Sequence, residues 1–234
     1  MTKQQTRRSL FVGAAAVAGI VLAGGAMAQT APAGVKVEYT PKKLPFDPSK
    51  VKGLSRKLLE SHYENNYTGA VKRLNAITAQ LAALDIATAP VFVVNGLKRE
   101  ELIATNSMII HGLYFDSLAG EGEPAGALAE VIARDFGSLA RWKAEFSATG
   151  KALGGGSGWV MLTWSPRDKR LVNTWAADHT MTLANGRPIL ALDMYEHAYQ
   201  MDYGAKAAAY VDAFMSGIRW DNVSSLYERY GKQS

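Results

Sequence analysis

The chain has 234 residues, 48% of them hydrophobic, and can therefore bury one or two modest cores. It contains no cysteine, which excludes disulfides, thiolate metal sites and thiol catalysis. The formal net charge is +5, but Lys3, Arg7 and Arg8 supply three of these charges, and the small remaining excess argues against a nucleic-acid partner, which would need a clustered basic face.

The first 28 residues have the pattern of a targeting segment. Thr6-Arg7-Arg8-Ser9-Leu10-Phe11 is typical of a twin-arginine export signal, and Ala26-Met27-Ala28 is typical of a cleavage site. The apolar run between them is short and rich in Gly and Ala, whereas a membrane span needs about 20 apolar residues. We therefore predict a cleaved signal peptide over residues 1–28, recognition by the twin-arginine export machinery, a periplasmic or otherwise exported location, and no membrane contact after cleavage. An uncleaved membrane anchor is the alternative.

The next part of the chain predicts an arm and a helical hairpin. Residues 29–49 are rich in Pro and Lys, which favours an extended arm. Apolar residues recur at helical spacing over 54–84, which predicts one long helix with a possible kink near Gly69. A second helix is expected over about 98–118, so residues 50–120 would form a helical hairpin domain.

Residues 121–234 predict a second domain of mixed structure. Helices are expected over about 126–135, 138–150 and 210–218, and strands over 159–164, 171–176 and 189–192. Ser165-Pro166-Arg167-Asp168 is a turn between the first two strands. The predicted fold class is α+β, with a long N-terminal α-helical hairpin and a C-terminal α/β half that carries a small three-stranded antiparallel sheet.

The chain has only four histidines, and their positions suggest a function. The four of them, His62, His111, His179 and His197, all lie in segments rich in apolar residues, where a lone imidazole is expensive to bury. Asp193 and His197 are four residues apart, directly after an apolar run, and can point at one spot. A carboxylate with imidazoles suits iron or manganese. Taken alone, the Asp193–His197 pair is also compatible with a structural hydrogen bond.

Three segments between about Glu60 and Tyr230 extend this pattern: Gly156-Ser157-Gly158-Trp159, Asp193-Met194-Tyr195-Glu196-His197-Ala198-Tyr199, and Ile218-Arg219-Trp220-Asp221. Together with the spacing of the histidines, they resemble the iron/manganese superoxide dismutase family. The resemblance implies that His62, His111, Asp193 and His197 bind one Fe or Mn ion per subunit, and that the protein converts superoxide into dioxygen and hydrogen peroxide. It does not choose between the two metals.

Two other functions stay open on the residues alone. At the position of the tyrosine that gates the family's substrate funnel, this chain has Ala70. An exported metal-binding protein of the same fold with little or no turnover is therefore the alternative. An oxygenase with two histidines and one carboxylate is also formally possible, but it would need an organic-substrate pocket and usually an all-β scaffold.

The resemblance also assigns residues around the ion. The family's glutamine, which hydrogen-bonds the metal-bound solvent, is replaced by Ser107 at one position and by a residue of Ala177-Asp178-His179 at the other, so His179 is the expected partner of that solvent. A surface turn residue is the alternative for His179. The side chains expected around the pocket are Trp159, Tyr195 and Tyr114, with Tyr67 near the funnel.

The resemblance further predicts a two-fold homodimer. In the family, the glutamate before the last ligand accepts a hydrogen bond from that ligand in the other subunit, and Glu196 and His197 match this pair. Asn66 and Gln200 stand where the family pairs a His with a Tyr across the interface. Two amides can donate to and accept from each other, so we expect Asn66 near Gln200 of the second subunit.

Overall fold

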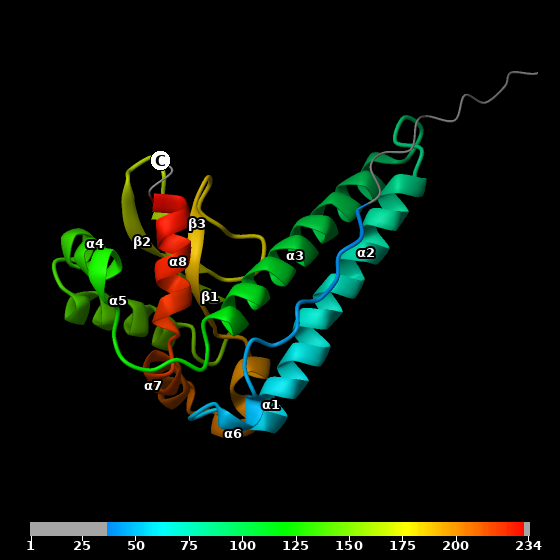
Figure 1. The fold of residues 1–234 in the computed structure, drawn as a ribbon. Coiled ribbons are helices and arrows are strands. Elements are labelled where there is room, and N and C mark those ends of the chain that lie inside the picture. The colour runs from blue at the N-terminus through cyan, green and yellow to red at the C-terminus, as the bar shows by residue number, and fades with distance from the viewer. Residues whose placement is uncertain (1–36, 232–234) are drawn as a thin grey trace, which may run out of the picture. The chain divides into compact units, whose positions relative to one another are not determined.

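A computed structural model describes residues 37–231 of the chain (Figure 1). The predicted signal peptide and the start of the predicted arm lie outside these residues. The helical segments are η1 (Pro48–Lys50), α1 (Arg56–Ser61), η2 (His62–Tyr67), α2 (Thr68–Ala83), α3 (Val91–Asp116), α4 (Gly126–Phe136), α5 (Leu139–Ala152), η3 (Glu196–Ala198), α6 (Gln200–Tyr203), α7 (Ala207–Ser216) and α8 (Trp220–Gly231), and the strands are β1 (Trp159–Ser165), β2 (Arg170–Ala176) and β3 (Arg187–Asp193). The predicted α+β class is confirmed.

The hairpin is formed by α2 and α3, which lie side by side along their length (Figure 1). Ser55 starts the first helix, because its side chain accepts the Leu58 N–H at 3.1 Å and so satisfies one of the free donors of the first turn. The described part of the arm, residues 37–47, forms no helix or strand. It is tied to α2 by two hydrogen bonds between Tyr39 and Asn75, of 2.9 and 2.8 Å.

The first long helix is irregular, but at a different place from the predicted one. The α-helix ends at Ser61, a π-helical segment occupies His62–Tyr67, and the α-helix resumes at Thr68. Gly69 lies inside the resumed helix, and a Cβ there would meet nothing within 4 Å. A π segment is a wider turn that is often found at functional sites, and here it begins at His62.

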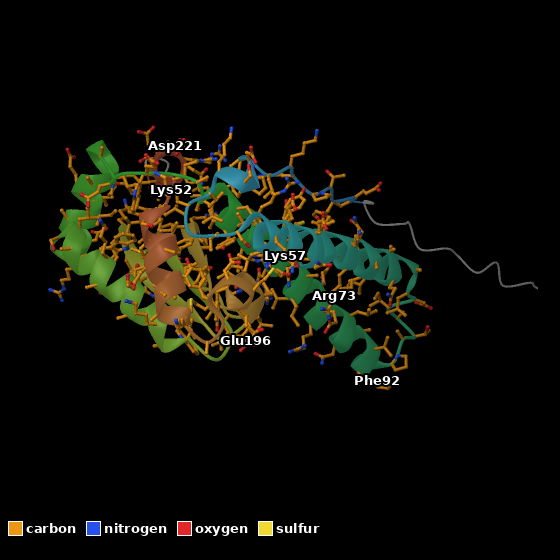
Figure 2. All side chains as sticks on the ribbon, turned by 90° about the horizontal axis from the view of Figure 1, so that it is seen from below. Lys52, Lys57, Arg73, Phe92, Glu196 and Asp221 are labelled. Atoms are coloured by element: carbon orange, nitrogen blue, oxygen red, sulfur yellow. The ribbon has the colours of Figure 1, made fainter. Side chains whose placement is uncertain are left out.

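Two other helix predictions were wrong in their bounds. The second helix begins at Val91 rather than near residue 98, and Pro90 is its N-cap. Its first turn was missed because Val91 and Phe92 are exposed and do not follow the apolar pattern of a core-facing helix (Figure 2). The closing helix predicted over 210–218 is α7, which runs from Ala207 to Ser216, and the last helix, α8, was not predicted.

The sheet has the strand order β2-β1-β3, and both pairs are antiparallel. All seven residues of β1 are buried, which requires cover on both faces because neighbouring side chains point to opposite sides. Helices α3, α4, α5 and α8 pack against these strands. The register sets Trp159 opposite Asp193.

The entrance to β1 leaves no room for a side chain. Gly158 has φ +138°, and a Cβ on it would lie 2.2 Å from the Ala176 carbonyl oxygen. Its own carbonyl accepts the Met194 N–H at 2.9 Å. Glycine is therefore required where β1 approaches both β2 and the end of β3.

One main core connects the first helices with the sheet. Its buried side chains include Leu58, Tyr114, Phe146, Trp159 and Val211. The predicted division of the chain after residue 120 stays a prediction. Among residues 37–231, none of the helices has both the length and the apolar character needed to span a membrane.

Candidate metal centre

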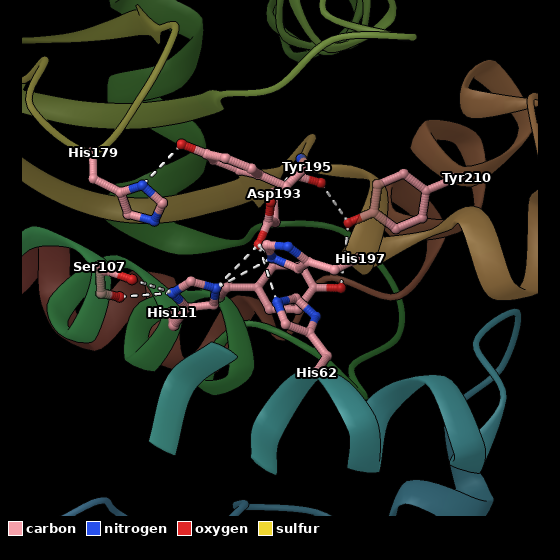
Figure 3. Close-up of polar contacts among 9 residues, drawn as sticks. His62, Ser107, His111, His179, Asp193, Tyr195, His197 and Tyr210 are labelled. Carbon is pink, nitrogen blue, oxygen red and sulfur yellow. Dashed lines mark hydrogen bonds and ion pairs between the residues drawn. The ribbon is translucent and has the colours of Figure 1, made fainter. Parts of the chain in front are cut away.

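The structure brings four predicted ligands together from four elements. His62 begins η2, His111 lies in α3, Asp193 ends β3 and His197 lies in η3. One donor atom from each lies within 4.8 Å of all the others (Figure 3). The Oδ2 atom of Asp193 is central: the Nε2 atoms of His62, His111 and His197 lie 3.0, 3.4 and 3.2 Å from it.

The end of β3 aims the carboxylate of Asp193 by local hydrogen bonds. The apolar residues before it are buried in the sheet, and the Tyr195 N–H donates to Asp193 Oδ1 at 2.9 Å. The Tyr210 hydroxyl donates to the Asp193 carbonyl at 2.8 Å, and the Tyr114 hydroxyl lies 3.3 Å from the Tyr210 oxygen. Oδ1 is thus engaged by the backbone, and Oδ2 faces the three imidazoles.

Burial favours the ligand form of the imidazoles. His62 and His111 are each 1% exposed, and burial lowers the pKa of both, that of His111 to about 3. Burial alone would raise the pKa of Asp193, but hydrogen bonds and charges from His197 and His62 outweigh it and hold this pKa well below its usual range. A neutral imidazole and a carboxylate are the protonation states that bind a metal.

The orientation of His111 is fixed from the side remote from Asp193. Its Nδ1–H donates to the backbone carbonyl of Ser107 at 2.8 Å, with the Ser107 hydroxyl at 3.2 Å. A neutral imidazole has one N–H, so the lone pair is on Nε2, which faces the cluster. The Nδ1 atom of His62 is buried without a hydrogen-bond partner among the described residues.

The donor set fits a single metal ion. Ligands bound at about 2.0–2.2 Å from one ion lie roughly 3 Å from their neighbours. The separations from Asp193 Oδ2 to the three imidazoles match this spacing. Three imidazoles with one carboxylate suit iron or manganese better than calcium or magnesium, which prefer oxygen ligands.

His179 lies beside the cluster rather than in it. Its ring stacks on the His111 ring at 5.8 Å and lies edge-to-face on Trp159 at 5.6 Å. Its Nδ1 atom is 2.8 Å from the Tyr195 hydroxyl, and its Nε2 atom is buried with no partner among residues 37–231 (Figure 3). Burial lowers the pKa of His179 and raises that of Tyr195 to about 12.

The three aromatic residues expected around the pocket all touch a ligand. Trp159 meets His111 at 5.0 Å, Tyr114 meets His62 at 5.0 Å, and Tyr195 stacks on His197 at 5.3 Å between ring centroids. Tyr67 is buried, and its hydroxyl accepts the Lys42 N–H at 3.0 Å, so it joins the arm to the hairpin.

The residues expected at a dimer interface lie on the surface of the described chain. Glu196 and Gln200 are exposed, and Asn66 is half-buried. Figure 2 shows Glu196 at the edge of the molecule. The neighbouring His197 is the most accessible of the four ligands, with 27% of its side chain exposed.

Sequence reasoning missed three contacts that hold the site from outside. Tyr210 fixes the backbone of Asp193, Ser107 orients His111 through its carbonyl, and the Asn106 amide donates to the His179 carbonyl at 2.6 Å. One signal was available for Tyr210, because a buried hydroxyl needs a partner and this tyrosine follows three alanines on an apolar helix. The other two contacts involve backbone carbonyls, which a sequence pattern does not reveal.

Comparison with known proteins agrees with this geometry. Residues 124–226 match the model of the iron/manganese superoxide dismutases, C-terminal domain. The chain is similar to "Superoxide dismutase [Fe]" of Cupriavidus metallidurans, with 69% identity over 189 residues, which cover 81% of this chain and 96% of the relative. It is 34% identical over 196 residues to "Superoxide dismutase [Mn] 1" of Halobacterium salinarum, covering 82% and 96%, and 35% identical over 190 residues to "Superoxide dismutase [Fe]" of Aquifex aeolicus, covering 78% and 88%.

These relatives are matched over nearly their whole length. The chain belongs to the iron/manganese superoxide dismutase family.

Proposed function

We propose that His62, His111, Asp193 and His197 hold the single iron or manganese ion with which this superoxide dismutase acts. The observation that carries the assignment is the convergence of one donor atom from each residue within 4.8 Å. When bound, the ion supplies the one-electron chemistry that converts superoxide into dioxygen and hydrogen peroxide.

The protein's own groups prepare the site for an anion. One carboxylate and three neutral imidazoles carry a single negative charge, so a site with a divalent or trivalent ion stays net positive and favours superoxide. His62, His111 and Asp193 are closed off from solvent, whereas part of His197 is accessible.

We assign His179 as the hydrogen-bond partner of solvent at the ion. Its support is the buried Nε2 atom, which has no partner among the described residues although His179 lies against His111. A buried polar nitrogen without a partner costs free energy, and a water molecule beside the ion would satisfy it. Ala70, at the position of the family's gate tyrosine, has no hydroxyl that could take this role.

The test of function separates an enzyme from a metal-binding protein without turnover. The purified chain is loaded with iron or with manganese, its metal content is measured, and superoxide removal is assayed. We expect one ion per chain and removal of superoxide with at least one of the two metals, and loss of both in His111→Ala. Stoichiometric metal without turnover by either form would favour the alternative of a metal-binding protein.

We also propose that the chain is exported and processed. The support is the Arg7-Arg8 pair, the short apolar run after it and the Ala26-Met27-Ala28 pattern. The mature chain would begin near Gln29, in the periplasm or otherwise outside the cytoplasm, and would not touch the membrane. Replacing both arginines with lysine should leave the precursor inside the cell, as followed by fractionation and N-terminal sequencing. Normal export of that variant would contradict a twin-arginine route.

We further propose a two-fold homodimer in which Glu196 of each subunit accepts a hydrogen bond from His197 of the other. In the described chain Glu196 is exposed and its side chain has no hydrogen bond or ion pair among residues 37–231, while His197 beside it is partly accessible. Asn66 would lie near the other subunit's Gln200. Light scattering should report a dimer for the native chain and for Glu130→Ala, an exposed control on α4, and a weaker dimer with lower metal affinity for Glu196→Ala. A fully active monomer at micromolar concentration would overturn the dimer.

A further inference from the structure

Among residues 37–231 the His179 ring has one polar contact, and that contact comes from the segment that carries Asp193 and His197. The Tyr195 hydroxyl lies 2.8 Å from His179 Nδ1, and the two rings are 4.9 Å apart (Figure 3). Tyr195 is itself held in place, because its ring stacks on His197 with an angle of 16° between the planes. The hydroxyl therefore reaches His179 from a fixed position.

The main chain of His179 is fixed separately from its ring. Asp178 Oδ1 accepts hydrogen bonds from the Thr180 N–H at 2.7 Å and from the Thr180 hydroxyl at 2.6 Å, which closes a tight turn around His179. Asn106 ties the His179 carbonyl to α3. These contacts place the residue, but they do not decide which ring nitrogen carries the proton.

The geometry assigns the donor in the Tyr195–His179 contact. The Tyr195 phenol has one O–H to donate, and the ring nitrogen Nδ1 of His179, a strong acceptor, lies 2.8 Å from its oxygen. Nδ1 accepts this bond, so the single N–H of a neutral imidazole is on Nε2.

We propose that Tyr195 is a positioning residue whose hydroxyl fixes the tautomer of His179, so that Nε2–H is always presented as a donor toward the metal centre. The proposal rests on the proposed role of His179 at the ion. Trp159 and His111 pack against the ring but offer it no polar contact that would replace the hydroxyl. Without the Tyr195 hydroxyl, both tautomers of His179 would be populated, and part of the molecules would present a lone pair where a donor is needed.

The first test reads the tautomer directly. Chains with ¹⁵N-labelled histidine are compared by NMR, metal-free and loaded with gallium(III), a diamagnetic trivalent ion, and a His179→Gln variant identifies the signals. In the native chain Nδ1 should be of the unprotonated type and Nε2 of the protonated type. In Tyr195→Phe, which keeps the stacked ring, the two signals should move toward each other. Tyr203→Phe is the matched control, because that hydroxyl bonds the Gly53 carbonyl instead.

The second test measures the consequence for a small anion. Azide binding to the iron-loaded chain should weaken roughly fivefold in Tyr195→Phe, the effect of one ordinary hydrogen bond, and should not change in Tyr203→Phe. A native chain with Nδ1 protonated would overturn the proposal, and so would unchanged ¹⁵N signals in Tyr195→Phe. Failure of the proposed function looks different, because metal or turnover would then be missing from the native chain whatever the tautomer of His179.

Discussion

The two halves of the candidate metal centre hold their side chains in different ways. His62 and His111 project from helices into the core, where aromatic rings surround them and one backbone carbonyl orients His111. Asp193 and His197 lie at the end of a strand and in the turn after it, where hydrogen bonds over a few residues set the geometry. The helical half depends on packing, and the strand half depends on close backbone approach. Substitutions in the two halves should therefore fail for different reasons.

The largest effect is expected in the strand half, at the carboxylate on which the three imidazoles converge. Asp193→Ala removes the central donor and should weaken iron or manganese binding by more than the roughly 10–100-fold that outer partners of a metal ligand cost. Metal content after dialysis, with the superoxide assay, measures this. Asp212→Ala, on the surface of α7, is the control and should keep both. Full metal occupancy in Asp193→Ala would remove Asp193 from the ligand set.

The next effect separates backbone geometry from ligand chemistry. Gly158→Ala places a Cβ 2.2 Å from the Ala176 carbonyl and keeps φ in a region unfavourable for alanine. We expect the free energy of unfolding to fall by about 3 kcal/mol. Denaturant unfolding of the metal-free chain would show the loss without involving the ion. A stability within about 0.5 kcal/mol of the native chain would mean that the end of β3 is not held as tightly as the structure indicates.

Acid should act on the helical half of the metal-free protein. His111 has a folded-state pKa of about 3, whereas its unfolded value is near 6.5, so below pH 6.5 the unfolded chain binds more protons than the folded chain. Stability should therefore be fully present above pH 6.5 and should fall by about 1.4 kcal/mol per pH unit for this group as the pH drops toward 3. Denaturant unfolding at several pH values measures the slope. His111→Gln should flatten it, and an equal slope in that variant would assign the acid sensitivity to other groups.

The smallest effect should have the opposite sign. Gly69 lies inside α2, where a Cβ meets nothing within 4 Å, and the same holds for Gly96 in α3. Replacing either with Ala should stabilise the chain by about 0.5–1 kcal/mol, because alanine loses less backbone entropy in a helix. Thermal unfolding compares these variants with Gly158→Ala. Destabilisation by Gly69→Ala would show that the hairpin, like the strand half, leaves no room for an added Cβ at its glycine.

The sequence predicted the four side chains that converge at the candidate metal centre because their chemistry is rare in the chain. Four histidines in apolar segments, with Asp193 and His197 four residues apart after a buried strand, left few other uses for these side chains. The strands were predicted within two residues at each end, since β1 and β3 are near-continuous apolar runs between turns. The hairpin was also predicted from helical spacing, although its helix bounds were not.

The parts of the fold and site that could not be predicted leave no pattern in the sequence. The π segment at His62–Tyr67 lies inside the helix predicted over 54–84, and the spacing of the apolar residues did not reveal it. The first turn of α3 carries exposed apolar residues, so it lacks the pattern of a core-facing helix. Tyr210 and Asp193 meet across 17 residues, and Ser107 acts through its carbonyl, which every residue type has. The role of His179 and the dimer contacts stay predictions.

The distance along the chain between the ligands has a consequence for folding. His62 and Asp193 are separated by 131 residues, whereas Asp193 and His197 are only four apart. No ion can meet all its ligands until the last strand has joined the first helix, and closing so long a loop is slow compared with local helix formation. Once bound, an ion that has no affinity for the unfolded chain stabilises the fold by about 4 kcal/mol at a thousand times its dissociation constant. The ion would thus link the first helices to the last strand, in a chain that has no cysteine to form a covalent cross-link.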